Sequence, residues 1–301
     1  MIPKEIFQKI RKIEITTNRL VTDVFAGEYH SVFKGQGIEF DEVREYNLGD
    51  DIRTIDWNVT ARTGKPHVKK YIEERELTVM ILVDVSKSCR FGTVNALKSQ
   101  LAAEVSALIA FSAIRNQDKV GVIAFSDKIE RYIPPRKGSN HVLRTVRDIL
   151  CFEAQNKGTN LIQAVEFLSK VTTRKTIAFI ISDFLDENLQ NPAKRENVKK
   201  AFAIANKHHD LVAITLNDPK ERELPRSGMI YLEDAETHEL TLVDASSLEI
   251  RKDFRENNQL RFSLREQLFK SVGMDFVNLS TDAPYLDGMV KFFTKRKRHR
   301  G

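Results

Sequence analysis

A carboxylate and two hydroxyls follow one another at alternate positions directly after an apolar run. Asp84 comes after the run over residues 77–83, and Ser86 and Ser88 come next. Such a run is typical of a central parallel strand covered on both faces, and open α/β sheets bind their ligands beyond the carboxyl ends of these strands. The three side chains could therefore ligate a cation, take part in catalysis or cap a helix.

Two further groups stand where they could join Asp84. Thr159 directly precedes an expected helix, and Asp183 follows a second apolar strand. Because parallel strands carry their carboxyl ends to one edge of a sheet, we expect these groups to converge there. Two carboxylates and three hydroxyls, without a thiol or an imidazole, suit Mg²⁺ or Mn²⁺. Considered singly, Thr159 or Asn160 could equally cap the helix, and Asp183 could have a structural role.

Apolar strands and amphipathic helices alternate over residues 77–217, which implies βαβ units and a parallel sheet. The expected strands cover residues 77–83, 120–125, 129–133, 176–182 and 211–217, and the expected helices cover residues 94–114, 142–150, 161–171 and 198–207. After these we expect a β-hairpin (229–233 and 240–243), a helix (246–271), a strand (274–279) and a closing helix (283–293). The predicted fold class is α/β, with a doubly wound, mostly parallel sheet, an N-terminal extension and a C-terminal β-hairpin plus helix insertion.

The charge balance helps to divide the chain into regions. The formal net charge is +6, and residues 291–301 hold six Lys and Arg residues and no acid. We expect this basic tail to be a solvated end and do not expect nucleic acid as a partner. Before it we place a domain over residues 77–290, with an insertion at about 218–273. An N-terminal region over residues 1–76 is expected to pack on this core.

Composition points to an ordinary globular chain. The 301 residues are 41% hydrophobic and 30% charged, and no apolar stretch approaches the roughly 20 residues of a membrane span. We therefore expect neither a membrane span nor a signal peptide, and a cytoplasmic location. Cys89 and Cys151 are the two cysteines and are expected to be free thiols.

Enzymatic motifs are a poor match. A phosphatase that begins with Asp84 would need a second Asp two residues later, where Ser86 stands. The chain has neither a Gly-x-Ser-x-Gly elbow nor a phosphate-binding loop. We assign no catalytic residue, although a divalent-cation-dependent phosphoesterase or nuclease stays open as an alternative. A third possibility is a metal-free site in a protein whose basic tail binds nucleic acid.

The five polar residues resemble the metal-ion-dependent adhesion site of von Willebrand factor A domains. Its members in this chain would be Asp84, Ser86, Ser88, Thr159 and Asp183. The resemblance implies that these residues hold a divalent cation, some directly and some through water. It also implies that an open coordination position accepts an acidic side chain from a protein partner.

The segment before the strand carries a second resemblance. Its distinctive short motifs are Gly35–Phe40, Arg44–Tyr46, Gly49–Arg53, Ile55–Trp57 and Ala61–Arg62. They are similar to the bacterial domain-of-unknown-function family fifty-eight, whose members join this signature to a von Willebrand A-like domain and associate with MoxR-type AAA ATPases. The resemblance implies a metal-dependent protein-protein interaction adaptor with a chaperone-like or complex-maturation role. For Arg53, Asp56 and Trp57 we expect an interdomain packing cluster around a buried tryptophan, or a structural ion pair.

Overall fold

The computed structural model describes residue 29 and residues 37–74, 76–93, 97–150, 152, 158–233 and 239–300. Cys151, Gly35, Gln36 and the first residues of the expected helix 94–114 lie outside these ranges. The chain divides into two units, a small one over Phe33–Leu77 and a large one that contains Thr78 and everything after it.

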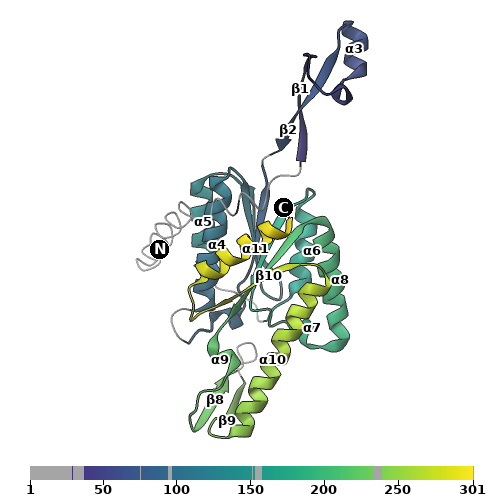
Figure 1. The fold of residues 1–301 in the computed structure, drawn as a ribbon. Helices are drawn as coiled ribbons and strands as arrows, with labels where there is room; N and C mark the ends of the chain where they lie inside the picture. The colour runs from purple at the N-terminus through teal and green to yellow at the C-terminus, as the bar shows by residue number, and fades with distance from the viewer. Residues whose placement is uncertain are drawn as a thin grey trace. The chain divides into compact units, whose positions relative to one another are not determined.

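A six-stranded sheet forms the centre of the large unit (Figure 1). Its strands are β3 (Thr78–Asp84), β4 (Lys119–Phe125), β5 (Ile129–Arg136), β6 (Ile177–Ser182), β7 (Asp210–Asn217) and β10 (Asp275–Ser280). Their order is β10-β7-β6-β3-β4-β5, and all neighbouring pairs are parallel except β4 with β5. The predicted α/β class with a doubly wound, mostly parallel sheet is confirmed.

The strand order reverses between β3 and β6. The chain leaves β3 toward β4 and β5 on one side, and it returns to build β6, β7 and β10 on the other. At such a reversal the connections leave in opposite directions, which opens a crevice at the carboxyl ends of the two central strands. Both strands are buried along almost their whole length, in agreement with their apolar sequences.

Helices cover both faces of this sheet (Figure 1). The long ones are α4 (Lys98–Arg115), α5 (Ser139–Leu150), α6 (Leu161–Val171), α8 (Pro192–His208), α10 (Leu248–Ser271) and α11 (Tyr285–Arg300). One face packs against α6, α8 and α10, because Met80 and Leu82 share a buried cluster with Val165, Phe202 and Phe269. On the other face lie α4, α5 and α11. The expected helices and strands are thus present, with β5 longer than predicted.

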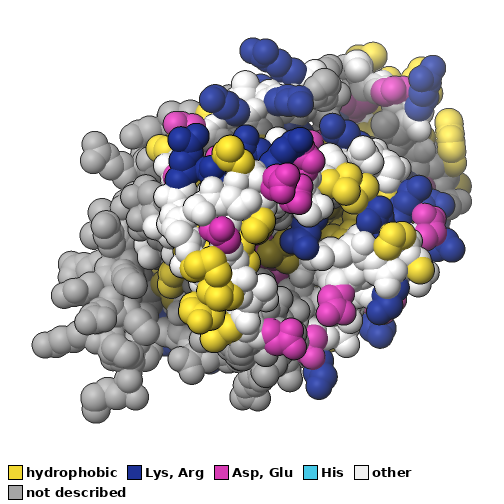
Figure 2. Space-filling view, turned by 90° about the horizontal axis from the view of Figure 1, so that it is seen from below, with side chains coloured by type: hydrophobic (Ala, Val, Ile, Leu, Met, Phe, Trp, Pro, Cys, Tyr) yellow, Lys and Arg dark blue, Asp and Glu magenta, His cyan; other side chains and the backbone are white. Residues whose placement is uncertain are grey.

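The insertion after β7 contains a short helix, α9 (Pro219–Arg222), and a two-stranded antiparallel sheet of β8 (Met229–Glu233) and β9 (Leu240–Asp244). The predicted hairpin and following helix are therefore confirmed. Tyr231 and Leu242 face each other across the strands, and both are exposed. Figure 2 views this end of the molecule and shows hydrophobic side chains among basic and acidic ones.

The basic C-terminal segment differs from the expected solvated tail, because residues 291–300 form the second half of α11. Arg296 is only 3% exposed. Its guanidinium group pairs with Asp210 of β7, and its Nε lies 3.1 Å from a carboxylate oxygen of Asp275 of β10. Phe293, one turn earlier, stacks near Phe179 of β6. One face of this segment therefore packs into the domain, whereas Lys291, Lys295, Lys297 and Arg298 are exposed.

The small unit is a hairpin of β1 (Gly37–Glu45) and β2 (His67–Glu74) with a short helix, α3 (Trp57–Thr63). Asp56 caps α3 and lies 3.4 Å from Lys69. Trp57 is 67% exposed, so it forms no buried cluster with the described residues of the small unit. The expected interdomain packing stays a prediction.

Among the helices that the structure describes, none combines the length and apolar character needed to span a bilayer.

Gly121 of β4 provides a test of the central packing. A Cβ atom there would lie 2.6 Å from the sulfur of Met80 and 2.9 Å from the backbone nitrogen of Pro135. Because backbone atoms cannot move aside cheaply, Gly121→Ala should lower the free energy of unfolding by about 1–3 kcal/mol, measured by urea denaturation. Gly228→Ala, which meets no atom within 4 Å, should change it by less than about 0.5 kcal/mol. Equal values for the two variants would contradict the described β4–β5 packing.

Arg296 provides a test of the C-terminal helix. Arg296→Met leaves Asp210 and Asp275 without their buried counter-ion, so unfolding should become easier by about 3 kcal/mol. The exposed neighbour Lys295 supplies the control, since Lys295→Met should cost less than about 0.5 kcal/mol. If Arg296→Met melted like the wild type, the segment would be a solvated tail after all.

Candidate metal centre

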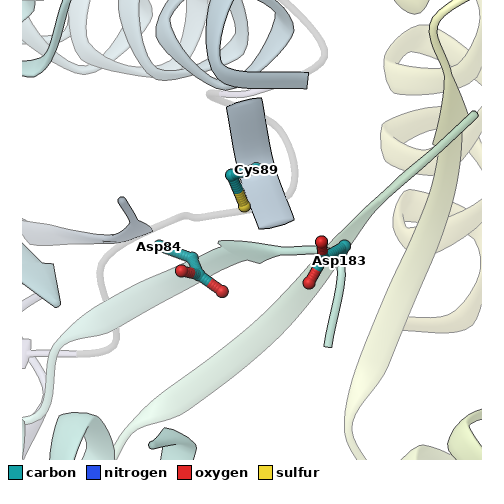
Figure 3. Close-up of side chains that lie close together, drawn as sticks. All are labelled: Asp84, Cys89 and Asp183. Carbon is teal, nitrogen blue, oxygen red and sulfur yellow. The ribbon is translucent and has the colours of Figure 1, made fainter. Parts of the chain in front are cut away.

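The two central strands deliver one carboxylate each to the point where the strand order reverses. Asp84 is the last residue of β3, and Asp183 is the first residue after β6. The strands are parallel and adjacent, with Val83 opposite Ile181. Both carboxylates are almost fully buried, and Figure 3 shows them beside each other near Cys89.

The turn after β3 folds its hydroxyls back toward Asp84. The backbone N–H of Ser86 donates to Asp84 Oδ1 at 2.9 Å, and Ser86 Oγ lies 3.0 Å from Ser88 Oγ. A single 3-10 turn, η3 (Lys87–Arg90), follows. Val85 is fixed by a backbone hydrogen bond to Phe125 at the end of β4. The alternate spacing of acid and hydroxyls thus places all three groups on one side of the turn.

Thr159 approaches from the loop before α6. Its hydroxyl lies 3.5 Å from Asp84 Oδ2, at the limit of a hydrogen bond. The helix cap is Asn160, whose side chain accepts from the backbone N–H of Gln163 at 3.0 Å. Asn160 also donates its backbone N–H to Ser126 after β4, which holds the loop against the sheet edge. Thr159 is therefore not the cap, and its side chain faces the carboxylate.

Asp183 completes the group of five residues that the sequence singled out. Its Oδ1 accepts from the backbone N–H of Leu185 at 3.1 Å, and the nearby Ser88 hydroxyl helps to lower its pKa. The structure therefore brings Asp84, Ser86, Ser88, Thr159 and Asp183 together, and all five are buried.

Four side chains that the sequence analysis did not assign also belong to this centre. Ser182 donates to Asp84 Oδ2 at 2.5 Å. Lys98 Nζ lies 2.6 Å from Asp183 Oδ2 and 2.5 Å from Glu221 Oε1. Arg265 donates to the backbone carbonyl of Asp183 at 2.9 Å. These residues come from β6, α4, α9 and α10.

The helical spacing of apolar residues could have identified two of these four residues, Lys98 and Arg265. Lys98 stands three residues before Leu101 and seven before Val105, on the buried stripe of α4. Arg265 stands three residues before Leu268 and four before Phe269, on the buried stripe of α10. A charged residue on such a stripe must find a buried partner, which is the signal of a charge cluster.

The two carboxylates have opposite pKa shifts. Burial and, next, the negative charge of Asp183 raise the pKa of Asp84 to about 7. Burial alone would also raise the pKa of Asp183, but the adjacent Lys98 ammonium outweighs it and lowers that pKa. Burial lowers the pKa of Arg265 only to about 10, so it stays charged at neutral pH. If every group were ionised, the three carboxylates of Asp84, Asp183 and Glu221 would be balanced by only two cations, Lys98 and Arg265. The cluster would then carry a net negative charge.

Cys89 lies within this cluster but does not suit a metal thiolate. Its sulfur and one oxygen from each of Asp84 and Asp183 lie within 4.8 Å of one another. Burial and then the two neighbouring carboxylates raise the pKa of the thiol well above its usual value, so it stays protonated. The expected free thiol at Cys89 is confirmed. The oxygen donors that remain are the hard ligands that Mg²⁺ or Mn²⁺ prefers, so the residues present fit such an ion.

Solved structures match this protein at low sequence identity. The hypothetical protein BatB of Bacteroides thetaiotaomicron is 14% identical, with a TM-score of 0.46, and the match covers 74% of this chain and 99% of that one. A von Willebrand factor type A protein of Catenulispora acidiphila is 14% identical, with a TM-score of 0.35, over 65% of this chain and 44% of that one.

Sequence relatives extend over most of the chain. The uncharacterized proteins Mb1516 of Mycobacterium bovis and Rv1480 of Mycobacterium tuberculosis are each 32% identical over 296 residues, which covers 96% of this chain and 89% of each relative. The model of the family described as "Protein of unknown function DUF58" matches residues 42–261. The chain therefore belongs to the DUF58 family.

Proposed function

We propose that this protein is a metal-dependent protein-protein interaction adaptor. The observation that carries the proposal is the convergence of two carboxylates and three hydroxyls at the reversal of strand order, where open α/β sheets bind ligands. Asp84, Ser86, Ser88, Thr159 and Asp183 would hold Mg²⁺ or Mn²⁺. The ion would act as a Lewis acid whose open position accepts a carboxylate from a partner protein.

With every group ionised, the cluster would carry a net negative charge, which supports cation binding. Asp84 is buried beside Asp183, and such a pair cannot keep both charges without a counter-ion. Lys98 balances one of them. A divalent cation would balance the other and leave charge to spare for an acidic ligand. The centre therefore suits a ternary contact of protein, metal and partner carboxylate.

The partner that we propose is a MoxR-type AAA ATPase in the cytoplasm, with a chaperone-like or complex-maturation role for the pair. The resemblance of the N-terminal signature to the family supports this choice. Part of that signature lies in the small unit, where Leu48, Ile52 and Trp57 are exposed. Exposed aromatic and aliphatic side chains are suited to protein contact.

The geometry favours binding over catalysis. Asp84, the residue that a phosphoesterase would use as nucleophile, already accepts hydrogen bonds from Ser86 N–H and Ser182 Oγ. Ser86 stands two residues later, where the acid-base partner of a haloacid-dehalogenase-like phosphatase would stand, and a hydroxyl cannot exchange protons in that role near neutral pH. We therefore place the cation in a docking role.

The first test is direct metal binding. Titration calorimetry with Mg²⁺ and Mn²⁺ should show one site in the wild type, and Asp84→Ala should abolish it because the central carboxylate is lost. Thr159→Val keeps the volume but removes a hydroxyl from the site, so it should weaken binding by about 10- to 100-fold. Thr145→Val is the matched control, since this buried threonine donates to His141 within α5. Equal metal affinity in the Thr159 and Thr145 variants would contradict the assignment.

The second test is partner capture. Immobilised wild-type protein should retain its MoxR-type ATPase in Mg²⁺, and EDTA, Asp84→Ala or Asp183→Ala should reduce retention at least tenfold. Asp282→Ala, in the exposed loop after β10, should retain the ATPase normally. Undiminished capture by both site variants, with and without EDTA, would rule out the metal bridge. Turnover of a generic phosphodiester that disappeared in Asp84→Asn would replace the adaptor with the enzymatic alternative.

A further inference from the structure

Lys98 is a permanent cation inside the candidate metal centre. It is the first residue of α4, and its side chain is fully buried, with 0% exposure. Its ammonium group bridges Asp183 Oδ2, at 2.6 Å, and Glu221 Oε1, at 2.5 Å. A buried lysine is tolerated only when it is paired in this way. Neither the metal-binding pattern nor the helix itself requires a lysine at this position.

Lys98 and a divalent ion would compete for the same carboxylate. Asp183 already accepts from Leu185 through Oδ1 and from Lys98 through Oδ2. An ion held at Asp84 and Asp183 would lie near a positive charge that cannot move into solvent, because Lys98 is enclosed. Like charges at close range in a low-dielectric interior repel strongly. Lys98 must therefore lower the affinity of this site for a cation.

Glu221 gives Lys98 a second partner. Its Oε2 accepts from the backbone N–H of Asp218, as part of the capping box of α9, so the carboxylate is held in place. If the Asp183 carboxylate turned toward a metal, the Lys98 ammonium would lose that ion pair but keep the one with Glu221. Lys98 thus has a defined place in both states of the site.

We propose that Lys98 is a resident cation that competes with the divalent ion for Asp183, and that the Lys98–Glu221 pair sets the metal affinity of the site. This inference rests on the proposed metal-binding function and goes beyond it, because it names the residue that regulates occupancy. With Lys98 on Asp183 the site is closed to the metal. With Lys98 on Glu221 alone, Asp183 is available and the site is open.

Lys98→Gln is the main test, since the amide keeps most of the length and can still donate to Asp183. Calorimetry on the isolated chain, with Mn²⁺ and Mg²⁺ as probes, should show a Kd about 10- to 100-fold lower than that of the wild type. Lys220→Gln is the control, because it removes one exposed lysine from α9, next to Glu221 in sequence. It should leave the Kd within about twofold. An unchanged or higher Kd in Lys98→Gln overturns the proposal.

Glu221→Gln should act in the opposite direction. It leaves Asp183 as the sole charged partner of Lys98, so the ammonium should remain there and the Kd should rise by about tenfold. This variant decides the matter if Lys98→Gln does not fold. A Kd for Glu221→Gln that is unchanged or lower would overturn the competition.

Thermal denaturation supplies a readout that does not depend on a partner protein. In EDTA, Lys98→Gln should melt below the wild type, because the buried Asp183 and the partly buried Glu221 lose their counter-ion. Saturating Mn²⁺ should raise its Tm more than that of the wild type, since a ligand that binds the native state stabilises it. An equal Tm rise in both proteins speaks against a competing lysine.

The two proposals can fail separately. If Lys98→Gln tightens metal binding but Asp84→Ala still captures the ATPase, the result supports competition by Lys98 and contradicts the metal-dependent adaptor function. If capture of the ATPase requires Asp84 while Lys98→Gln leaves the Kd for the metal unchanged, the result supports the adaptor function and contradicts the competition by Lys98. If neither the wild type nor Lys98→Gln binds a metal, both fall together.

Discussion

The burial of two carboxylates side by side is the constraint on which the rest of this site depends. Asp84 and Asp183 end adjacent parallel strands, so the hydrogen-bond register of the sheet holds them together. Neither can move away without breaking the central pair of strands. Their repulsion must therefore be relieved locally, by a proton, by hydrogen bonds or by cations. Ser182 beside Asp84 and Lys98 beside Asp183 serve this need.

Three helices outside the sheet depend on the same charges. Lys98 ties the start of α4 to the centre, Glu221 ties α9, and Arg265 ties α10. Arg265 also donates to Asn217, the last residue of β7, so it connects two strand ends at once. The β8–β9 hairpin lies between α9 and α10 in the chain. Both connections of the insertion are thus attached to the candidate metal centre.

Most of the fold and the five oxygen-bearing residues could be predicted from sequence, because each depends on local pattern. Apolar runs identified β3 and β6, and strand polarity then placed Asp84 and Asp183 at one edge. Lys98 was missed because a lysine among apolar residues does not reveal its partner, which here lies 85 positions away. Arg296 was counted as part of a solvated tail because its acidic partners belong to β7 and β10. Long-range ion pairs and the exposure of Trp57 are set by tertiary packing, which periodicity does not report.

The internal cations also indicate what a metal would contribute. Small metal-dependent domains unfold without their ion because nothing else holds the ligands together. Here the candidate ligands are held by the ends of the strands and the loops that follow them, and Lys98 already pairs with the carboxylates of Asp183 and Glu221. A metal at this centre would therefore add little that folding requires, and its binding energy would be available for attachment of a partner. If Lys98 competes with the ion as proposed, the lysine that pairs with Asp183 would also keep metal binding weak enough to be reversed, which is the property that a docking site controlled by an ion requires.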